Sequence, residues 1–170
     1  MKKLLCVIFS LSLLLSLASC AAPKDKIREP VSFYYRRLEL SYGTTPEVFD
    51  KEIRQAEGYR QNYSYLLSLY VKGPESYSLY NPFPRGTLLT DFALRDGTAF
   101  VNLSSSFAAL TGLDLSLACA CMTLTVCEMT GAQQVTISAA DALLDGNSQI
   151  TMTPDDLLMM DNSSIVISPE

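Results

Sequence analysis

The 170-residue chain contains no histidine. Without histidine, neither a serine nor a cysteine nucleophile has its usual imidazole base, and the commonest zinc ligand is missing. The sequence also has neither a glycine-rich phosphate loop nor a Gly-x-Ser-x-Gly nucleophile motif. Ser104, Ser105 and Ser106 have no evident general base and fit a strand-to-helix connection better. The sequence therefore nominates no catalytic residue, no metal ligand and no cofactor site.

Positive charge is scarce, with 13 lysine and arginine residues against 18 aspartate and glutamate residues. Removal of residues 1–19, argued below, would take Lys2 and Lys3 away and leave 11 cations against 18 anions, a formal charge of −7. The adjacent basic pair of the mature chain, Arg36-Arg37, lies in an aromatic, strand-like run and fits a solvated face. An acidic chain without a basic cluster is a poor binder of nucleic acid or anionic lipid.

The apolar run at the N-terminus, residues 4–15, is too short for a permanent transmembrane helix and follows two lysines, as in a signal peptide. Leu17-Ala18-Ser19-Cys20 then resembles a bacterial lipobox, which implies cleavage before Cys20 and a diacylglyceryl thioether on its sulfur. We therefore expect residues 1–19 to be a lipoprotein signal peptide. The mature protein would be lipid-anchored at Cys20 on the extracytoplasmic face of the cell membrane, with residues 20–30 as a flexible tether.

Three elements are expected in the first half of the mature chain. Residues 31–40 are rich in aromatic and aliphatic side chains and predict a strand. Residues 48–57 follow a helix-start signal, Thr45-Pro46-Glu47, but show a weak alternation, so helix and strand both remain open, and we favour a strand. Residues 59–71 predict a helix that Lys72-Gly73-Pro74 ends, because apolar side chains recur at spacings of three and four: Tyr59, Tyr63, Leu66, Leu67 and Tyr70.

Residues 87–103 predict a β-hairpin. Asp96-Gly97 is a two-residue type I′ turn signal between two apolar runs. With these two residues as the loop, apolar side chains face each other across the hairpin on one side, so turn and alternation agree. The expected pairs are Leu94 with Ala99, Phe92 with Val101, and Thr90 with Leu103.

The second half adds a helix and two strands. Residues 114–129 predict a helix that Gly131 ends, with a broad buried stripe formed by Leu113, Leu117, Ala120, Cys121, Leu124 and Cys127. Alternation over residues 134–139 predicts a half-buried strand, and residues 150–152 one more. Residues 153–170 form an acidic tail. Its Asp155-Asp156 and Asp161-Asn162 lack EF-hand spacing, which favours a solvated tail over a calcium loop.

Cys119, Cys121 and Cys127 invite a disulfide or a metal site because an exported chain could oxidise them. Residues 119 and 121 point to nearly opposite sides of a helix, which suits neither a disulfide nor a metal pair. Three thiols also leave one unpaired. We therefore interpret these cysteines as small core residues.

The order of several motifs resembles the GerMN domain of Gram-positive sporulation and spore-germination lipoproteins. The motifs are Val71-Lys72-Gly73-Pro74, then Pro84-Arg85-Gly86-Thr87-Leu88-Leu89, then Asp96-Gly97 to Val101-Asn102-Leu103-Ser104, and then a helix, a glycine and a strand. The resemblance covers residues 31–152 in a single copy, and family members often carry aspartate at the position of Asn102. The expected fold is α+β, a small mixed or antiparallel sheet with two helices packed on one face.

For function, the sequence and the resemblance favour a non-enzymatic, membrane-tethered interaction or assembly module in sporulation, germination or the cell envelope. Its partners would be envelope or sporulation proteins and not nucleic acid. The alternative is a lipoprotein that binds peptidoglycan or a small solute, for which a groove lined by Tyr63, Tyr70, Tyr77 and Tyr80 would be evidence. An enzyme with paired carboxylates is a further rival, but no pair stands out. An exposed sheet edge would favour the interaction module. A deep polar pocket would favour the ligand-binding lipoprotein or the enzyme.

Overall fold

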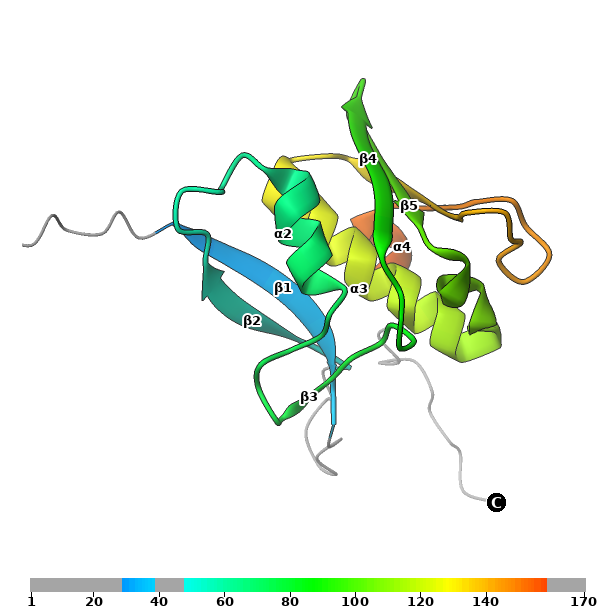
Figure 1. Cartoon of the computed structure of the whole chain (residues 1–170), viewed down its shortest axis with the longest axis horizontal. Coiled ribbons are helices and arrows are strands. Elements are labelled where there is room, and N and C mark those ends of the chain that lie inside the picture. Colours follow the sequence, from blue (N-terminus) through cyan, green and yellow to red (C-terminus); the bar gives the residue numbers. More distant parts are fainter. Residues whose placement is uncertain (1–28, 39–47, 159–170) are drawn as a thin grey trace, which may run out of the picture.

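The computed structural model describes residues 29–38 and 48–158. The expected signal peptide, Cys20, most of the tether, and Asp161-Asn162 lie outside these residues. The α+β class is confirmed, and the strands form two sheets (Figure 1). One sheet has the order β2-β1-β3, and the other, which is mixed, has the order β4-β5-β6-β7.

The three-stranded sheet consists of β1 (Pro30–Arg37), β2 (Phe49–Gln55) and β3 (Leu79–Tyr80), all antiparallel. The strand interpretation of residues 48–57 is thereby confirmed. Every second side chain of β1 is buried, from Val31 through Phe33 to Tyr35, while those between them are partly exposed. This period of two places one face of β1 in the core.

Helix α2 (Tyr63–Tyr70) begins four residues later than expected. Residues 59–62 instead form turns, in which Tyr59 N–H donates to the Ala56 carbonyl and Asn62 N–H to the Tyr59 carbonyl. The Asn62 side chain then caps the helix by accepting from the Tyr65 N–H. The side chains of Leu66, Leu67 and Tyr70 are buried as expected, but Tyr59 is not part of the stripe.

Strands β4 (Leu89–Arg95) and β5 (Thr98–Leu103) form the expected hairpin. Asp96 and Gly97 both have positive φ, 49° and 75°, as a type I′ turn requires. The pairs Leu94–Ala99 and Phe92–Val101 are confirmed, but the pair Thr90–Leu103 is wrong. The ladder shifts between Leu89 and Asp91, so Leu89 faces Leu103. Thr90 is the extra residue, and its hydroxyl donates to the Asn102 carbonyl.

The four-stranded sheet is completed by β6 (Gln134–Ala139), parallel to β5, and β7 (Ile150–Met152), antiparallel to β6. Both expected strands are therefore confirmed. The parallel pair needs a crossover, which the short 3₁₀ helix η1 (Ser105–Ala109) and helix α3 (Gly112–Thr130) supply. Gly131 ends α3 in the left-handed conformation, with φ of 75°, as its position predicted.

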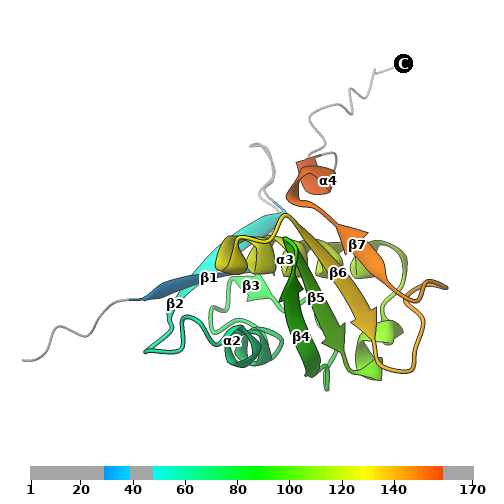
Figure 2. The ribbon, with the colours of Figure 1, turned by 90° about the horizontal axis from the view of Figure 1, so that it is seen from above.

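Helix α3 contacts β1 of one sheet and β6 and β7 of the other (Figure 2). It is long and apolar enough to cross a membrane, but 61% of its apolar window is buried inside the fold, as in a core helix. Because it is covered from more than one direction, its burial is wider than the expected stripe and includes Cys119, Met122 and Val126. Leu113 was expected to be buried, which is wrong, because its side chain is 68% exposed.

A short helix, α4 (Pro154–Leu158), occupies the start of the expected tail. It contacts α3, and Leu157 is buried. Asp156 accepts hydrogen bonds from the backbone N–H and the hydroxyl of Thr153 at its N-terminus. This helix is not predictable from the sequence pattern, because five residues are too few to show a period.

Candidate interaction site

Strand β2 has an open edge. Its ladder with β1 includes the bonds from Arg37 N–H to the Val48 carbonyl and from Ala56 N–H to the Glu29 carbonyl. Bonded pairs alternate in an antiparallel ladder, so residues 50, 52 and 54 turn their backbone groups toward β1, and residues 49, 51, 53 and 55 turn theirs outward. Among the described residues, no strand pairs with this outer edge.

The far edge of β1 shows how such an edge is otherwise closed. Beside β3, side chains from two helices bond its backbone: Tyr34 N–H donates to the Thr125 hydroxyl at 2.9 Å, and the Tyr70 hydroxyl donates to the Tyr34 carbonyl at 2.7 Å. On the outer edge of β2, the Lys51 N–H donates at 2.8 Å to the carboxylate of its neighbour Asp50, and no side chain from a helix bonds this strand's outward backbone groups among the described residues. The side chains of Lys51, Ile53 and Gln55 are exposed. Four residues of β2, at positions 49, 51, 53 and 55, therefore turn their backbone groups toward an edge that no described strand covers.

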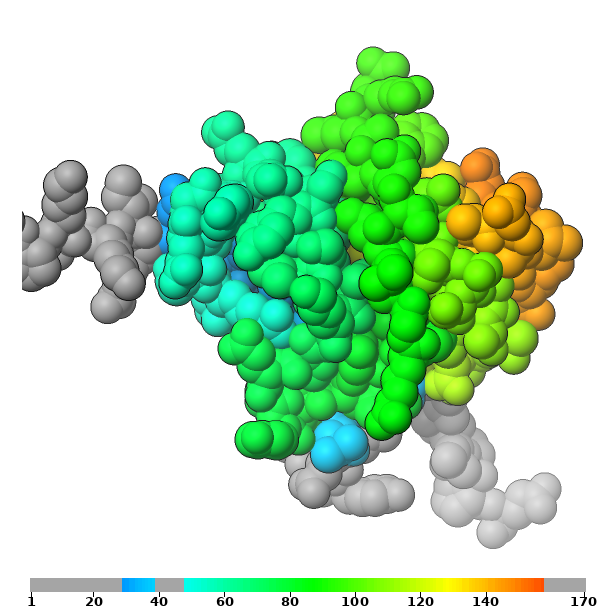
Figure 3. Space-filling view, viewed as in Figure 1, coloured from blue at the N-terminus to red at the C-terminus, as the bar shows by residue number. Residues whose placement is uncertain are grey.

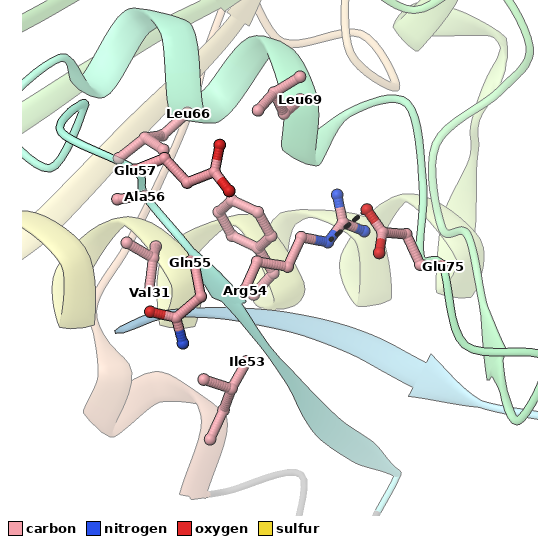
Figure 4. Close-up of a pocket in the computed structure, with 10 residues that line it drawn as sticks. Val31, Ile53, Arg54, Gln55, Ala56, Glu57, Leu66, Leu69 and Glu75 are labelled. Carbon is pink, nitrogen blue, oxygen red and sulfur yellow. Dashed lines mark ion pairs between the residues drawn. The ribbon is translucent and has the colours of Figure 1, made fainter. Parts of the chain in front are cut away.

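An open hollow of about 350 Å³ lies between β2 and α2 (Figure 4). Val31 and Phe33 of β1 contribute apolar lining, and Leu66 and Leu69 come from α2. Two exposed glutamates, Glu57 and Glu75, also line it. The hollow thus combines an apolar surface with carboxylates, next to an unpaired strand edge.

Arg54 and Glu52 form a largely buried ion pair beside the hollow, with side chains 15% and 12% exposed and a separation of 2.5 Å. The Arg54 guanidinium also donates to the Gly73 carbonyl at 2.8 Å and lies over the Phe33 ring, 5.1 Å from its centre. The second Glu52 oxygen accepts from the backbone N–H groups of Glu75 and Ser76. The pair therefore fastens the loop after α2 to β2.

The charges around the hollow do not balance. Glu52 offsets the charge of Arg54, and Glu75 lies 3.7 Å from the same guanidinium with its side chain 80% exposed. Glu57 adds a further carboxylate. One cation against three anions leaves the hollow with a formal charge of −2, which favours a ligand with apolar and cationic groups.

The four tyrosines of the expected groove are not brought together. Tyr70 is fully buried and Tyr63 packs edge-on against Phe92. Tyr77 is 97% exposed, and Tyr80 lies beneath the Arg36 guanidinium at β3. None of them lines the hollow. The residues that line the hollow come from two strands, a helix and two loops. They were not predicted, because no local pattern of the sequence joins these segments.

The cysteines lie where the core interpretation places them. Cys119 and Cys121 are buried free thiols and Cys127 is half-buried. Burial raises the pKa of Cys119 to about 12 and raises the pKa of Cys121 and Cys127 as well. A raised pKa keeps a thiol neutral, whereas a reactive cysteine has a lowered pKa.

The other shifted groups also favour packing over chemistry. Burial and the neighbouring Glu128 raise the pKa of Tyr34 to about 12, and the Tyr34 hydroxyl donates to the Glu128 carboxylate. Burial would raise the pKa of Glu128, but hydrogen bonds from Ser32 and Tyr34 and the charge of Lys51 lower it. Over the described part of the chain, no three cysteine, aspartate or glutamate side chains are grouped so that they could hold a metal ion.

The family model described as "Sporulation and spore germination" matches residues 33–145, from β1 to the loop before β7. The chain belongs to this family. The GerMN resemblance of the sequence is thereby confirmed, and the family description names a cellular process, not a reaction.

Two solved structures are similar to this GerMN chain. The tandem GerMN domains of the sporulation protein GerM from Bacillus subtilis align over 80% of the chain with 14% identity and a TM-score of 0.57. The chain spans about half of that structure, 49%, as one copy of the domain would. A candidate lipoprotein from Clostridium perfringens aligns over 76% of this chain and 89% of its own, with 17% identity and a TM-score of 0.49. Among curated proteins, no significant match was found.

Proposed function

We propose that this protein is a membrane-tethered, extracytoplasmic lipoprotein that acts as a non-enzymatic interaction module in sporulation, germination or the cell envelope. The membership in a sporulation and germination family supports the setting. The lipobox-like Leu17-Ala18-Ser19-Cys20 supports the anchor. The raised thiol pKa values support a role without a cysteine nucleophile.

The observation that carries the proposal is the open edge of β2 beside the negatively charged hollow. An extended segment of a partner protein can add a strand here, with its backbone bonded to residues 49, 53 and 55 and to the Lys51 carbonyl, because the Lys51 N–H already donates to Asp50. Every second side chain of that segment would then turn toward the hollow, where apolar groups meet Leu66 and Leu69 and a cationic group meets Glu57 or Glu75. The main chain would supply affinity and the hollow would supply selectivity.

Proline at position 53 tests this edge. The Ile53 N–H points outward, so Ile53→Pro removes a donor that β1 does not use, and proline is tolerated on such an edge. Ile53→Val keeps the donor and is the matched control. A photo-crosslinking residue in place of Lys51 should capture the same partner in wild type and Ile53→Val cells and lose it with Ile53→Pro, together with the sporulation or germination phenotype.

The outcome that contradicts the proposal is equally specific. If Ile53→Pro folds, as judged by circular dichroism and an unchanged Tm, and still crosslinks and functions like Ile53→Val, then β2 is not the binding edge. The absence of catalysis is checked separately by offering cell-wall substrates to the purified protein. Turnover that disappears on a single Asp→Asn or Glu→Gln change would overturn the non-enzymatic role.

The hollow also favours a second candidate function, a lipoprotein that binds peptidoglycan fragments or a small solute. Its volume lies at the lower end of the range for small-molecule sites. Saturable NMR shifts of residues around Leu69 on addition of such fragments, lost in Leu69→Arg but retained in Ile53→Pro, would favour this function over strand addition.

A further inference from the structure

The first described residues are fixed to the segment between β2 and α2. Ala56 N–H donates to the Glu29 carbonyl at 2.9 Å, and Gly58 N–H donates to the Glu29 carboxylate at 2.9 Å. The Arg60 guanidinium donates to the Pro30 carbonyl. The chain from the anchor therefore enters the domain at a defined place, beside residues 56–60 (Figure 1).

Two exposed aromatic rings lie beside this entry point. The rings of Tyr59 and Tyr65 are 4.5 Å apart between centres, and the residues are 49% and 40% exposed. Figure 3 shows this segment, in cyan, next to the blue start of β1 at the left margin of the surface. We call Tyr59, Arg60 and Tyr65 the entry face.

From this juxtaposition we infer that the entry face rests on the lipid bilayer at the level of the headgroups. The inference rests on the proposed lipid anchor at Cys20. Pro30, the first residue of β1, lies ten positions after Cys20 in the chain. A fully extended chain of this length keeps the entry point within about 35 Å of the membrane surface. Tethering of this kind gives a high effective concentration, so even weak contacts are populated.

The chemistry of the entry face suits a zwitterionic interface. Tyrosine is enriched at the membrane–water boundary because its ring is apolar and its hydroxyl is polar. The partly exposed Glu29, whose carboxylate accepts from the Gly58 N–H next to the Pro30 carbonyl that Arg60 bonds, adds an opposite charge at the entry point, so attraction to anionic lipid contributes little. The contact should therefore form on neutral phosphatidylcholine and persist in high salt.

The alternative aromatic surface lies at the other end of β1. Tyr80 belongs to β3, which pairs with Arg36 and Arg37, and Tyr77 lies just before it, while the entry face adjoins Pro30. The length of β1 separates these places by roughly 23 Å. With the entry face on the membrane, β2 would run from Gln55 near the bilayer to Phe49 away from it, and its open edge would remain available to a partner.

The chain contains no tryptophan, so a single introduced tryptophan reports on its own surroundings. The experiment uses the full lipidated protein with Tyr65→Trp, or with Tyr77→Trp as the matched control, in phosphatidylcholine vesicles with brominated acyl chains. The indole at position 65 should be quenched several-fold more strongly by brominated than by ordinary lipid, and its emission should be blue-shifted. The indole at position 77 should respond to a soluble quencher only.

Equal quenching of the two indoles in vesicles that carry the protein would overturn the inference while leaving the anchor intact. Failure of both variants to float with the vesicles would contradict the anchor itself, and the membrane contact with it. A quenching difference that disappears in high salt would show binding through charge and would also count against the aromatic contact.

Discussion

Two threonines on α3 differ in what their hydroxyl groups bond. Thr125 is buried, and its hydroxyl accepts the Tyr34 N–H from β1. Thr123 is equally buried, but its hydroxyl has no hydrogen-bond partner among the described residues. A buried hydroxyl without a partner costs free energy, whereas a methyl group of the same shape does not.

We therefore expect opposite effects from the same substitution at these two positions. Thr123→Val should raise the free energy of unfolding by about 1 kcal/mol, and Thr125→Val should lower it by about 1–2 kcal/mol because the Tyr34 N–H is left unbonded. Urea unfolding of both variants checks this. A loss of the same size in both would mean that the Thr123 hydroxyl has a partner after all.

The buried Cys119 predicts a loss of stability at alkaline pH. Burial raises its pKa from 9.0 to about 12, so in this interval the unfolded chain ionises and the folded chain does not. The contribution is complete below pH 9.0 and disappears as the pH rises toward 12. Tyr34, with a pKa raised from 10.0 to about 12, acts in the same direction.

The measurement is the free energy of unfolding as a function of pH. Cys119→Ala should reduce the alkaline slope by up to about 1.4 kcal/mol per pH unit, the value for one proton. In native alkylation, Cys127 should react before Cys119 and Cys121, which should need denaturation. Rapid labelling of all three thiols, or an unchanged slope, would count against the buried, neutral state.

At the scale of elements, the Arg54–Glu52 pair connects β2 to the loop after α2 and shapes the hollow. Arg54→Met should destabilise the fold by about 3 kcal/mol, because Glu52 is left as a buried charge without its partner. Lys51→Met on the same strand is the control. Lys51 lies 3.8 Å from Glu128 with both side chains well exposed, so its loss should cost less than about 1 kcal/mol.

Chemical denaturation of both variants separates a buried from an exposed ion pair. Equal losses would show that the Arg54 pair contributes no more than a surface contact. Because Glu52 also holds the Glu75 and Ser76 N–H groups, the Arg54→Met protein should in addition show weaker amide protection in the loop at residues 73–76.

At the scale of the whole molecule, the proposed anchor at Cys20 would decide where the open edge of β2 is presented. If Cys20 carries a diacylglyceryl group, its two acyl chains hold the protein stably, at about 0.8 kcal/mol per buried methylene. Cys20→Ser should therefore leave the precursor unprocessed or release the protein from the membrane. Fractionation with an antibody checks this, and a Cys20→Ser protein that is processed and membrane-bound as before would refute lipidation.

Local chemistry made part of the fold predictable. The Asp96-Gly97 turn and the alternation around it specify the hairpin and two of its pairs, because both signals come from neighbouring residues. Gly131 likewise marks the end of α3 through its own conformational freedom. The bulge at Thr90 was not predictable, because the shift depends on how Leu89 meets Leu103 across the sheet.

The sequence by itself determined the family, the class of fold, most strands and both long helices. The tertiary structure decided which strands share a sheet, that α3 is buried from more than one direction, and that no described strand covers the outer edge of β2. The hollow unites Val31, Arg54, Leu66 and Glu75, which lie up to 44 positions apart in the chain. Such a site depends on hydrogen bonds and packing between segments that are distant in the chain. Contacts of this kind leave no periodic pattern in the sequence.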